Sequence, residues 1–141
     1  MSNFIQEEST RSDETDVKIF EILVNWIENH YKDSAPITYS DLVNQLNSYS
    51  VIPVNIGMRL GRVSNYSKEN NFPPISAIVG GLEFCEPGKG FFEALGLENL
   101  SSDEKLEKWV SLLKEVYSTP VEDWKNLYIK YKDFVTNLEE E

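Results

Sequence analysis

The fold is decided by three consecutive segments, PITYSDLV (36–43), NIGMRLGRV (55–63) and PPISAIVGG (73–81). In the first, apolar residues on either side of a threonine predict a short extended strand at 37–39, and Ser40 is a suitable N-cap for a short helix. The second has apolar residues at helical spacing and predicts a helix from 54 to about 70. The third is β-branched and predicts a strand over 75–84. Strand, two helices, strand and glycine-rich turn, in this order, are the plan of a winged helix.

An amphipathic pattern predicts a further helix on the N-terminal side of this centre. Apolar residues recur every three or four positions over 16–32, and Thr15 or Asp16 is expected to cap the helix. The preceding residues are mostly polar, with Phe4 and Ile5 as the apolar residues after Met1, so we expect residues 1–15 to form a loose tail.

The last third of the chain predicts two more helices. Ser101 with Glu104 matches a capping box, and Thr119-Pro120 begins the second helix with a proline at its first position. About two residues separate the helices, so we expect an antiparallel hairpin over about 101–139.

The expected fold class is therefore α+β and mostly helical. A single domain over 16–141 would contain a winged-helix-like core at about 36–92, an N-terminal helix and the C-terminal hairpin. Within the core, Gly57 and Gly61 share one helical face, which predicts that another backbone packs closely there.

Composition describes a globular chain of 141 residues, with 40% apolar and 26% charged residues. Its one cysteine, Cys85, allows no intrachain disulfide, and neither a signal peptide nor a membrane-length apolar segment is visible. These features predict a cytoplasmic protein that does not insert into a membrane.

The formal net charge of −11 is unevenly distributed. Residues 1–32 hold seven acids and three bases, residues 33–82 hold three of each, and residues 83–141 hold fourteen acids and seven bases. Such acidity disfavours non-specific binding to nucleic acid or anionic membrane and favours either solubility alone or a basic protein partner. The residues that we expect to meet such a partner are Glu98, Asp103, Glu104, Glu107, Glu122 and Asp123.

Two arginines on the expected second helix of the core favour nucleic acid instead. Arg59 and Arg62 are three residues apart and so share one helical face, from which arginine can contact phosphate or guanine. The full candidate nucleic-acid surface consists of Ser40, Arg59, Arg62, Asn65, Tyr66 and Lys68. Ion pairing of these cations with Asp41, Glu69 or the acidic flanks is the competing structural interpretation.

Nothing in the sequence indicates catalysis, a metal or a cofactor. Cys85 is far in sequence from the single histidine, His30, so neither a thiol nucleophile with its base nor a structural zinc site is expected. The glycine pairs at 80–81 and 88–90 match neither phosphate-binding nor dinucleotide-binding patterns. We therefore expect a protein that is not an enzyme.

The centre of the chain resembles the DNA-binding domain of alkylguanine DNA alkyltransferases and of alkyltransferase-like proteins. Ile37-Thr38-Tyr39 matches the family's opening, Gly57 to Arg62 its recognition helix, and Pro74 to Val79 its active strand. The resemblance implies a winged helix that binds DNA. However, Ile75 replaces the alkyl-accepting cysteine and Ser76 the histidine, so alkyl transfer is not implied. The chain also resembles uncharacterised stand-alone bacterial domains with a similar segment over 87–92.

Two function hypotheses follow. The first is a non-enzymatic, acidic protein-binding module, such as an inhibitor, a toxin-immunity protein or an anti-defence protein, that masks a basic surface of its target. The alternative is a winged-helix nucleic-acid-binding protein that uses the helix around Arg59 and Arg62.

Overall fold

The computed structural model describes residues 12–49, 56–80, 92 and 95–139. Its helices are α1 (Glu14–Asn29), α2 (Tyr39–Ser48), α3 (Ile56–Glu69), α5 (Ser102–Ser118) and α6 (Val121–Glu139). A 3-10 helix, η1 (Ile75–Ile78), and two short strands, β1 (Ile37–Thr38) and β2 (Val79–Gly80), complete this part of the chain. The expectation of a mostly helical α+β protein is confirmed.

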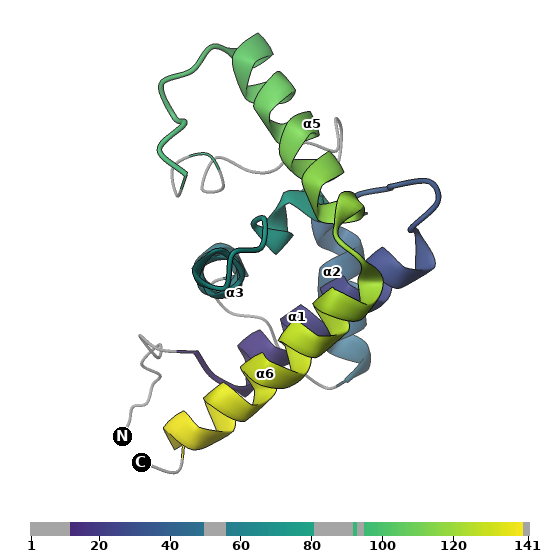
Figure 1. Cartoon of the computed structure of the whole chain (residues 1–141), viewed down its shortest axis with the longest axis vertical. Coiled ribbons are helices and arrows are strands. Elements are labelled where there is room, and N and C mark those ends of the chain that lie inside the picture. The colour runs from purple at the N-terminus through teal and green to yellow at the C-terminus, as the bar shows by residue number, and fades with distance from the viewer. Residues whose placement is uncertain (1–11, 50–55, 81–91, 93–94, 140–141) are drawn as a thin grey trace.

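Helix α1 is the centre of the core, since it is apolar around most of its circumference. Its buried apolar side chains are Ile19, Phe20, Ile22, Leu23, Val24 and Ile27. Helix α6 packs along α1, and α2, α3 and η1 also contact it (Figure 1). The remaining helices are thus arranged around a helix that needs burial on several sides.

Helix α1 begins earlier than its apolar pattern predicts. Neither Thr15 nor Asp16 is the cap, because Asp13 occupies that position and α1 starts at Glu14. The Asp13 side chain accepts a hydrogen bond from the Asp16 backbone N–H at 3.1 Å, and Asp16 accepts one from the Asp13 N–H. This reciprocal capping box starts the helix inside the segment that we expected to be a tail.

The cap of α2 also differs from the prediction. Thr38 is the N-cap, and its Oγ1 accepts a hydrogen bond from the Asp41 N–H at 3.0 Å. Ser40 instead lies exposed in the first turn of α2. The helix starts directly after the strand, because the same threonine ends β1 and caps α2.

The strand expected over 75–84 is wrong in its first half. Residues 75–78 form the 3-10 helix η1, and only Val79 and Gly80 are extended before the described segment ends. Two serines of α3 supply hydrogen-bond acceptors for the first N–H groups of this 3-10 helix. Ser67 Oγ accepts from the Ile75 N–H and Ser64 Oγ from the Ser76 N–H. Side-chain capping of the first N–H groups therefore overrides the β propensity of the sequence.

The two strands form a parallel pair, in which Ile37 is opposite Val79 and Thr38 is opposite Gly80. This pairing holds the segment before α2 beside the segment after η1. The turn expected at 86–90 as a wing tip, and the short helix expected after it, lie outside the described residues, apart from Phe92.

The C-terminal helices are present, but their antiparallel packing is not. Helix α6 packs along α1, whereas α5 packs on η1 and leads away from α6 (Figure 1). Trp109 Nε1 donates to the Ala77 carbonyl of η1 at 2.6 Å, and Tyr117 Oη donates to the Ala35 carbonyl at 2.6 Å. The two helices thus pack on different parts of the protein and meet only at their junction, where Trp124 Nε1 donates to the Val116 carbonyl at 3.0 Å; the short connection makes a corner instead of a hairpin.

The glycine face of α3 also differs from the expectation. A Cβ at Gly57 or Gly61 would meet no atom of the described structure within 4 Å outside the backbone of α3. No close backbone contact within the described residues therefore explains either glycine.

We expect Gly57→Ala and Gly61→Ala each to raise the free energy of unfolding by about 0.5 to 1 kcal/mol, because alanine costs less backbone entropy in a helix. Urea unfolding measures the effect. Gly96→Ala is the control: its φ of 73° lies in the left-handed region, so this substitution should destabilise the protein. A loss of stability at position 57 or 61 would contradict an open face.

Tyr131 of α6 is fully buried, and its hydroxyl makes no hydrogen bond with the described residues. Burial raises the pKa of its phenol above the ordinary value of 10. The folded protein consequently holds this proton more tightly than the unfolded chain does.

We expect Tyr131→Phe to change the free energy of unfolding at neutral pH by less than about 1 kcal/mol, since no hydrogen bond is lost. In the wild type, the stability linked to this phenol is complete below about pH 10 and is lost as the pH rises through the raised folded-state pKa. The variant should lose less stability in that range. Urea unfolding at neutral and alkaline pH measures both effects, and an equal alkaline loss in the two proteins would contradict the expectation.

Candidate functional site

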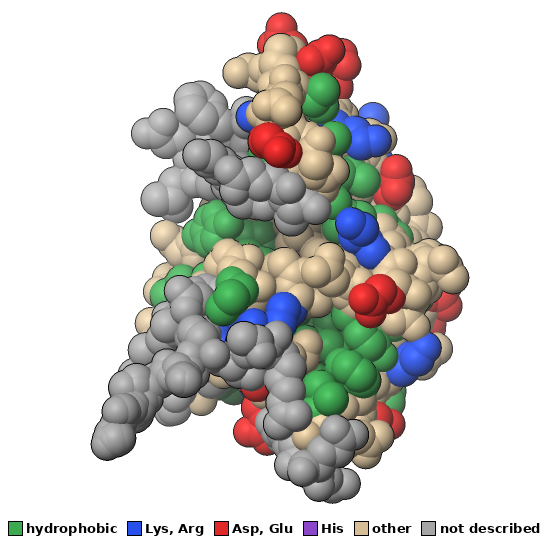
Figure 2. Space-filling view, turned by 90° about the vertical axis from the view of Figure 1, so that its left-hand side faces the viewer, with side chains coloured by type: hydrophobic (Ala, Val, Ile, Leu, Met, Phe, Trp, Pro, Cys, Tyr) green, Lys and Arg blue, Asp and Glu red, His purple; other side chains and the backbone are tan. Residues whose placement is uncertain are grey.

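All six acids expected to contact a partner are exposed: Glu98, Asp103, Glu104, Glu107, Glu122 and Asp123. Five of them lie on α5 or in the first turn of α6. Acidic side chains gather at the end of the molecule where α5 begins (Figure 2). Glu104 also has a structural role, because its carboxylate accepts the Ser101 N–H at 3.0 Å in the predicted capping box, which is confirmed.

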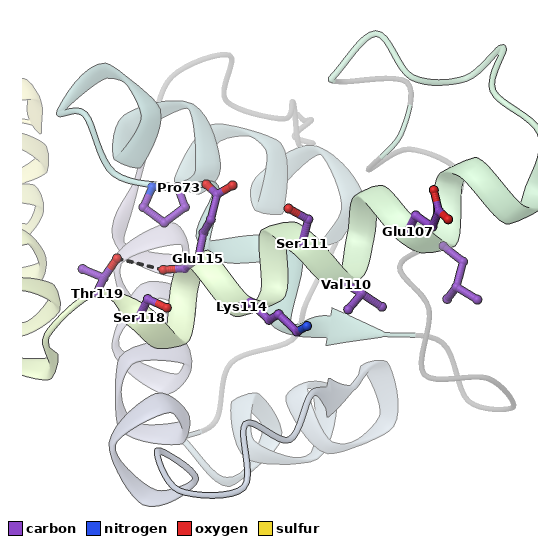
Figure 3. A pocket seen from close by; sticks show the side chains of 9 residues that line it. Pro73, Glu107, Val110, Ser111, Lys114, Glu115, Ser118 and Thr119 are labelled. Carbon is purple, nitrogen blue, oxygen red and sulfur yellow. Dashed lines mark hydrogen bonds between the residues drawn. The ribbon is translucent and has the colours of Figure 1, made fainter.

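A hollow of about 840 Å³ lies along the outer face of α5, with Pro73 at one side (Figure 3). Leu106 and Val110 give it an apolar part, and Glu107 and Glu115 line it with carboxylates. Ser111 stands between the two glutamates, one helical turn from each, and its small side chain leaves space there. The hollow therefore combines an apolar strip with an acidic edge.

The acidic edge continues one turn toward the start of α5. Asp103, Glu107 and Glu115 stand at positions i, i+4 and i+12 of the helix, so they follow one ridge of its surface. None of the ion pairs found in the described part of the chain involves these three carboxylates. Their charge is therefore available to a partner.

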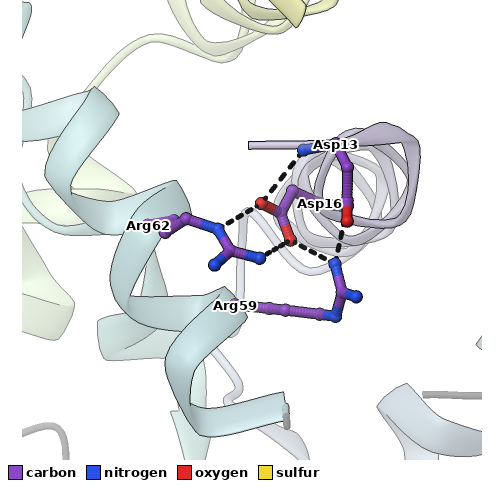
Figure 4. Close-up of polar contacts among 4 residues, drawn as sticks. All are labelled: Asp13, Asp16, Arg59 and Arg62. Atoms are coloured by element: carbon purple, nitrogen blue, oxygen red, sulfur yellow. Dashed lines mark hydrogen bonds and ion pairs between the residues drawn. The ribbon is translucent and has the colours of Figure 1, made fainter. Parts of the chain in front are cut away.

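The two arginines of α3 are instead engaged inside the protein (Figure 4). Arg62 binds the Asp16 carboxylate through Nε at 2.7 Å and Nη2 at 3.3 Å. Arg59 Nη1 donates to Asp16 at 3.0 Å and to Asp13 at 2.6 Å. Asp16 is fully buried and Arg59 is only 8% exposed, so these charges neutralise one another away from solvent.

Each oxygen of Asp16 accepts two hydrogen bonds. Oδ1 accepts from both arginines, and Oδ2 accepts from Arg62 and from the backbone N–H of Asp13. A carboxylate offers about four acceptor positions, so this buried charge is fully satisfied. Burial alone would lower the pKa of Arg59, but its hydrogen bonds to Asp13 and Asp16 outweigh that effect and raise the pKa. Arg59 is therefore expected to stay charged and paired with both carboxylates.

Of the other four residues of the candidate nucleic-acid surface, three are exposed and one is partly buried. Ser40, Asn65 and Lys68 are exposed. Tyr66 packs against Tyr131 and Phe134, with ring centroids 4.6 and 5.3 Å away, and contributes to the contact between α3 and α6. Among these six residues, Lys68 is the one cation that is exposed.

The described residues bring together no group of three side chains that could hold a metal ion. His30 stacks on Trp26 at the end of α1, with ring centroids 4.0 Å apart, and Cys85 lies outside the described residues. No helix in the described part of the chain has both the length and the apolar character needed to cross a membrane.

Sequence reasoning missed the partner of the arginines. Pairing with an acidic flank is one of the expected alternatives, but Asp13 falls in the expected tail and Asp16 is expected only to cap the N-terminal helix, so the sequence does not predict their approach to α3. The signal was the Asp-x-x-Asp spacing at the start of α1, which marks a capping box and turns both carboxylates toward one end of the helix. The hollow on α5 could be anticipated only in part, from the acids around it.

No protein-family model, curated protein or solved structure matches this chain.

Replacing Arg62 with alanine should lower the free energy of unfolding by about 3 kcal/mol, because it leaves a fully buried carboxylate without its bidentate partner. Urea unfolding measures this loss. Lys68→Ala is the matched control: it removes one cation from the exposed face of the same helix and should change stability by less than about 0.5 kcal/mol. Equal effects of the two substitutions would contradict the structural role of Arg62.

Proposed function

We propose that this chain is a non-enzymatic, acidic protein-binding module that covers a basic surface of another protein. Inhibitors, toxin-immunity proteins and anti-defence proteins are the functional classes to which such a module would belong. The proposed contact surface comprises the hollow along α5 and the exposed acids at the beginning of α5 and α6.

One observation carries the proposal: the two arginines of α3 are turned inward, whereas the acids of α5 and α6 face solvent. Pairing of Arg59 and Arg62 with Asp13 and Asp16 removes two charges of each sign from the surface. The whole net charge of −11 therefore belongs to the other side chains. Such a surface accelerates encounter with a basic partner and repels phosphate.

Nucleic-acid binding by a winged-helix-like centre is the second candidate. In its favour, α2 and α3 follow each other in the expected order, and Ser40, Asn65 and Lys68 are exposed. Against it, Arg59 and Arg62 could contact phosphate only after leaving a buried carboxylate, which costs several kcal/mol. Several phosphate contacts are typical of such interfaces, so this candidate ranks below protein binding.

Capture of partners from a lysate of the source cells, with and without nuclease, tests the proposal when two charge variants are compared. The test variant changes four acids of the proposed surface: Asp103→Asn, Glu107→Gln, Glu122→Gln and Asp123→Asn. The matched control changes four exposed acids elsewhere: Glu14→Gln, Asp41→Asn, Glu69→Gln and Asp133→Asn. Both variants lose the same charge, and both lose acids from the first turns of two helices.

We expect the wild type and the control to retain a basic protein after nuclease treatment, and the test variant to retain about tenfold less. Nucleic acid that co-elutes and disappears with nuclease would favour the second candidate. Equal losses in both variants would show that total charge, and not the proposed surface, determines capture.

A further inference from the structure

Helix α5 carries a wider apolar arc than the body of the domain covers. Trp109, Leu112 and Val116 are buried against the rest of the protein. On the adjoining side, Leu106 is 41% exposed and Val110 is only partly buried. This uncovered edge coincides with the hollow along α5 (Figure 3).

The spacing of the lining residues is that of a helix-packing surface. Four of them stand at positions i, i+3, i+4 and i+7, which frame one hole on a helix: Glu107, Val110, Ser111 and Lys114. Ser111 is a small residue in the ridge that runs from Glu107 to Glu115, and it interrupts this ridge. A large apolar side chain from a second helix could lie over Ser111 and contact Val110.

Charge determines which kind of helix fits. Asp103, Glu107 and Glu115 form the ridge beside the apolar strip and have no ion-pair partner in the described structure. Lys114 is the one cation among the described residues that line the hollow, and it stands at the end of the apolar row away from Leu106. A helix with an apolar face and flanking lysines or arginines is complementary to this arrangement, whereas nucleic acid and anionic lipid are not.

The docking face is also held firmly. Trp109 and Tyr117 fix the inner side of α5 through hydrogen bonds to the carbonyls of Ala77 and Ala35. A face that is already ordered loses little entropy when a partner binds, which favours affinity.

We propose that the outer face of α5 docks a basic amphipathic helix of the partner protein, with an apolar side chain over Ser111 and basic side chains along Asp103, Glu107 and Glu115. This inference rests on the proposed protein-binding function and names the segment of the partner that would be recognised. It corresponds to the helix-in-groove mode of peptide recognition.

Binding of three synthetic peptides of about 18 residues tests the proposal, since each can form a helix of about five turns. The first is a leucine–lysine amphipathic helix, the second has the same composition scrambled so that no apolar face forms, and the third replaces lysine with glutamate. Fluorescence anisotropy gives the affinities, and backbone amide NMR shifts locate the contact. We expect the amphipathic lysine peptide to bind at least about tenfold more tightly than the scrambled one, the glutamate peptide not to bind, and the shifts to gather at Val110 and Ser111.

Three variants of the full chain locate the contact. Ser111→Trp fills the hollow at an exposed position and should abolish binding of the lysine peptide without loss of thermal stability. The double variant Glu107→Lys/Glu115→Lys should weaken binding at least about tenfold, and its matched control Asp41→Lys/Glu69→Lys should not. Equal binding of the scrambled peptide, or equal weakening by the two double variants, would overturn the docking site.

The same Ser111→Trp variant separates this inference from the function on which it rests. If it still captures the basic partner, and capture still depends on the acids, then the protein-binding function stands and the helix-docking inference fails. If capture depends on nuclease-sensitive material even in the wild type, both fail. Loss of capture together with loss of peptide binding supports both.

Discussion

The arrangement of the helices depends on one buried carboxylate. Asp16 receives hydrogen bonds from two arginines of α3 and from the backbone at the start of α1, so it joins the end of the central helix to a helix more than forty residues further along the chain. A buried charge is tolerated only when its acceptor positions are satisfied, and here all of them are. Any shift of α3 along α1 would break several of these bonds together. The pairing therefore fixes the register of the two helices as well as their contact.

This interaction also determines how the surface charge should be interpreted. Read from the sequence alone, Arg59 and Arg62 are the main positive feature of an otherwise acidic chain. In the structure they neutralise the acids nearest to them, and the exposed carboxylates of α5 and α6 become the main electrostatic feature. The same two residues thus support opposite functional interpretations, depending on whether their acidic partners are known.

Local patterns predicted most of the secondary structure, whereas tertiary contacts explain the misses. The capping box at Ser101 and the helices over 101–139 follow from short-range rules and are confirmed. The 3-10 helix η1 was not predicted because its first N–H groups are capped by Ser64 and Ser67, which lie on another helix. The expectation of an antiparallel hairpin was wrong, because a short connection allows two helices to pack together but does not decide which element each helix packs against. For the candidate site, the exposed acids were predictable from charge distribution, but the adjoining hollow depends on which edge of α5 the body leaves uncovered.

The double use of Asp16 Oδ2, by the capping box of α1 and by Arg62, has a consequence for where the folded unit starts. An isolated peptide of α1 could form its cap but would lack the arginines, and α3 alone would lack the anion that holds its two cations together. The full set of hydrogen bonds to Asp16 should therefore form only when α3 docks, although the two segments are far apart in the chain. In protein engineering, the shortest fragment that retains this arrangement begins at Asp13, whose side chain binds Arg59 and whose backbone binds Asp16.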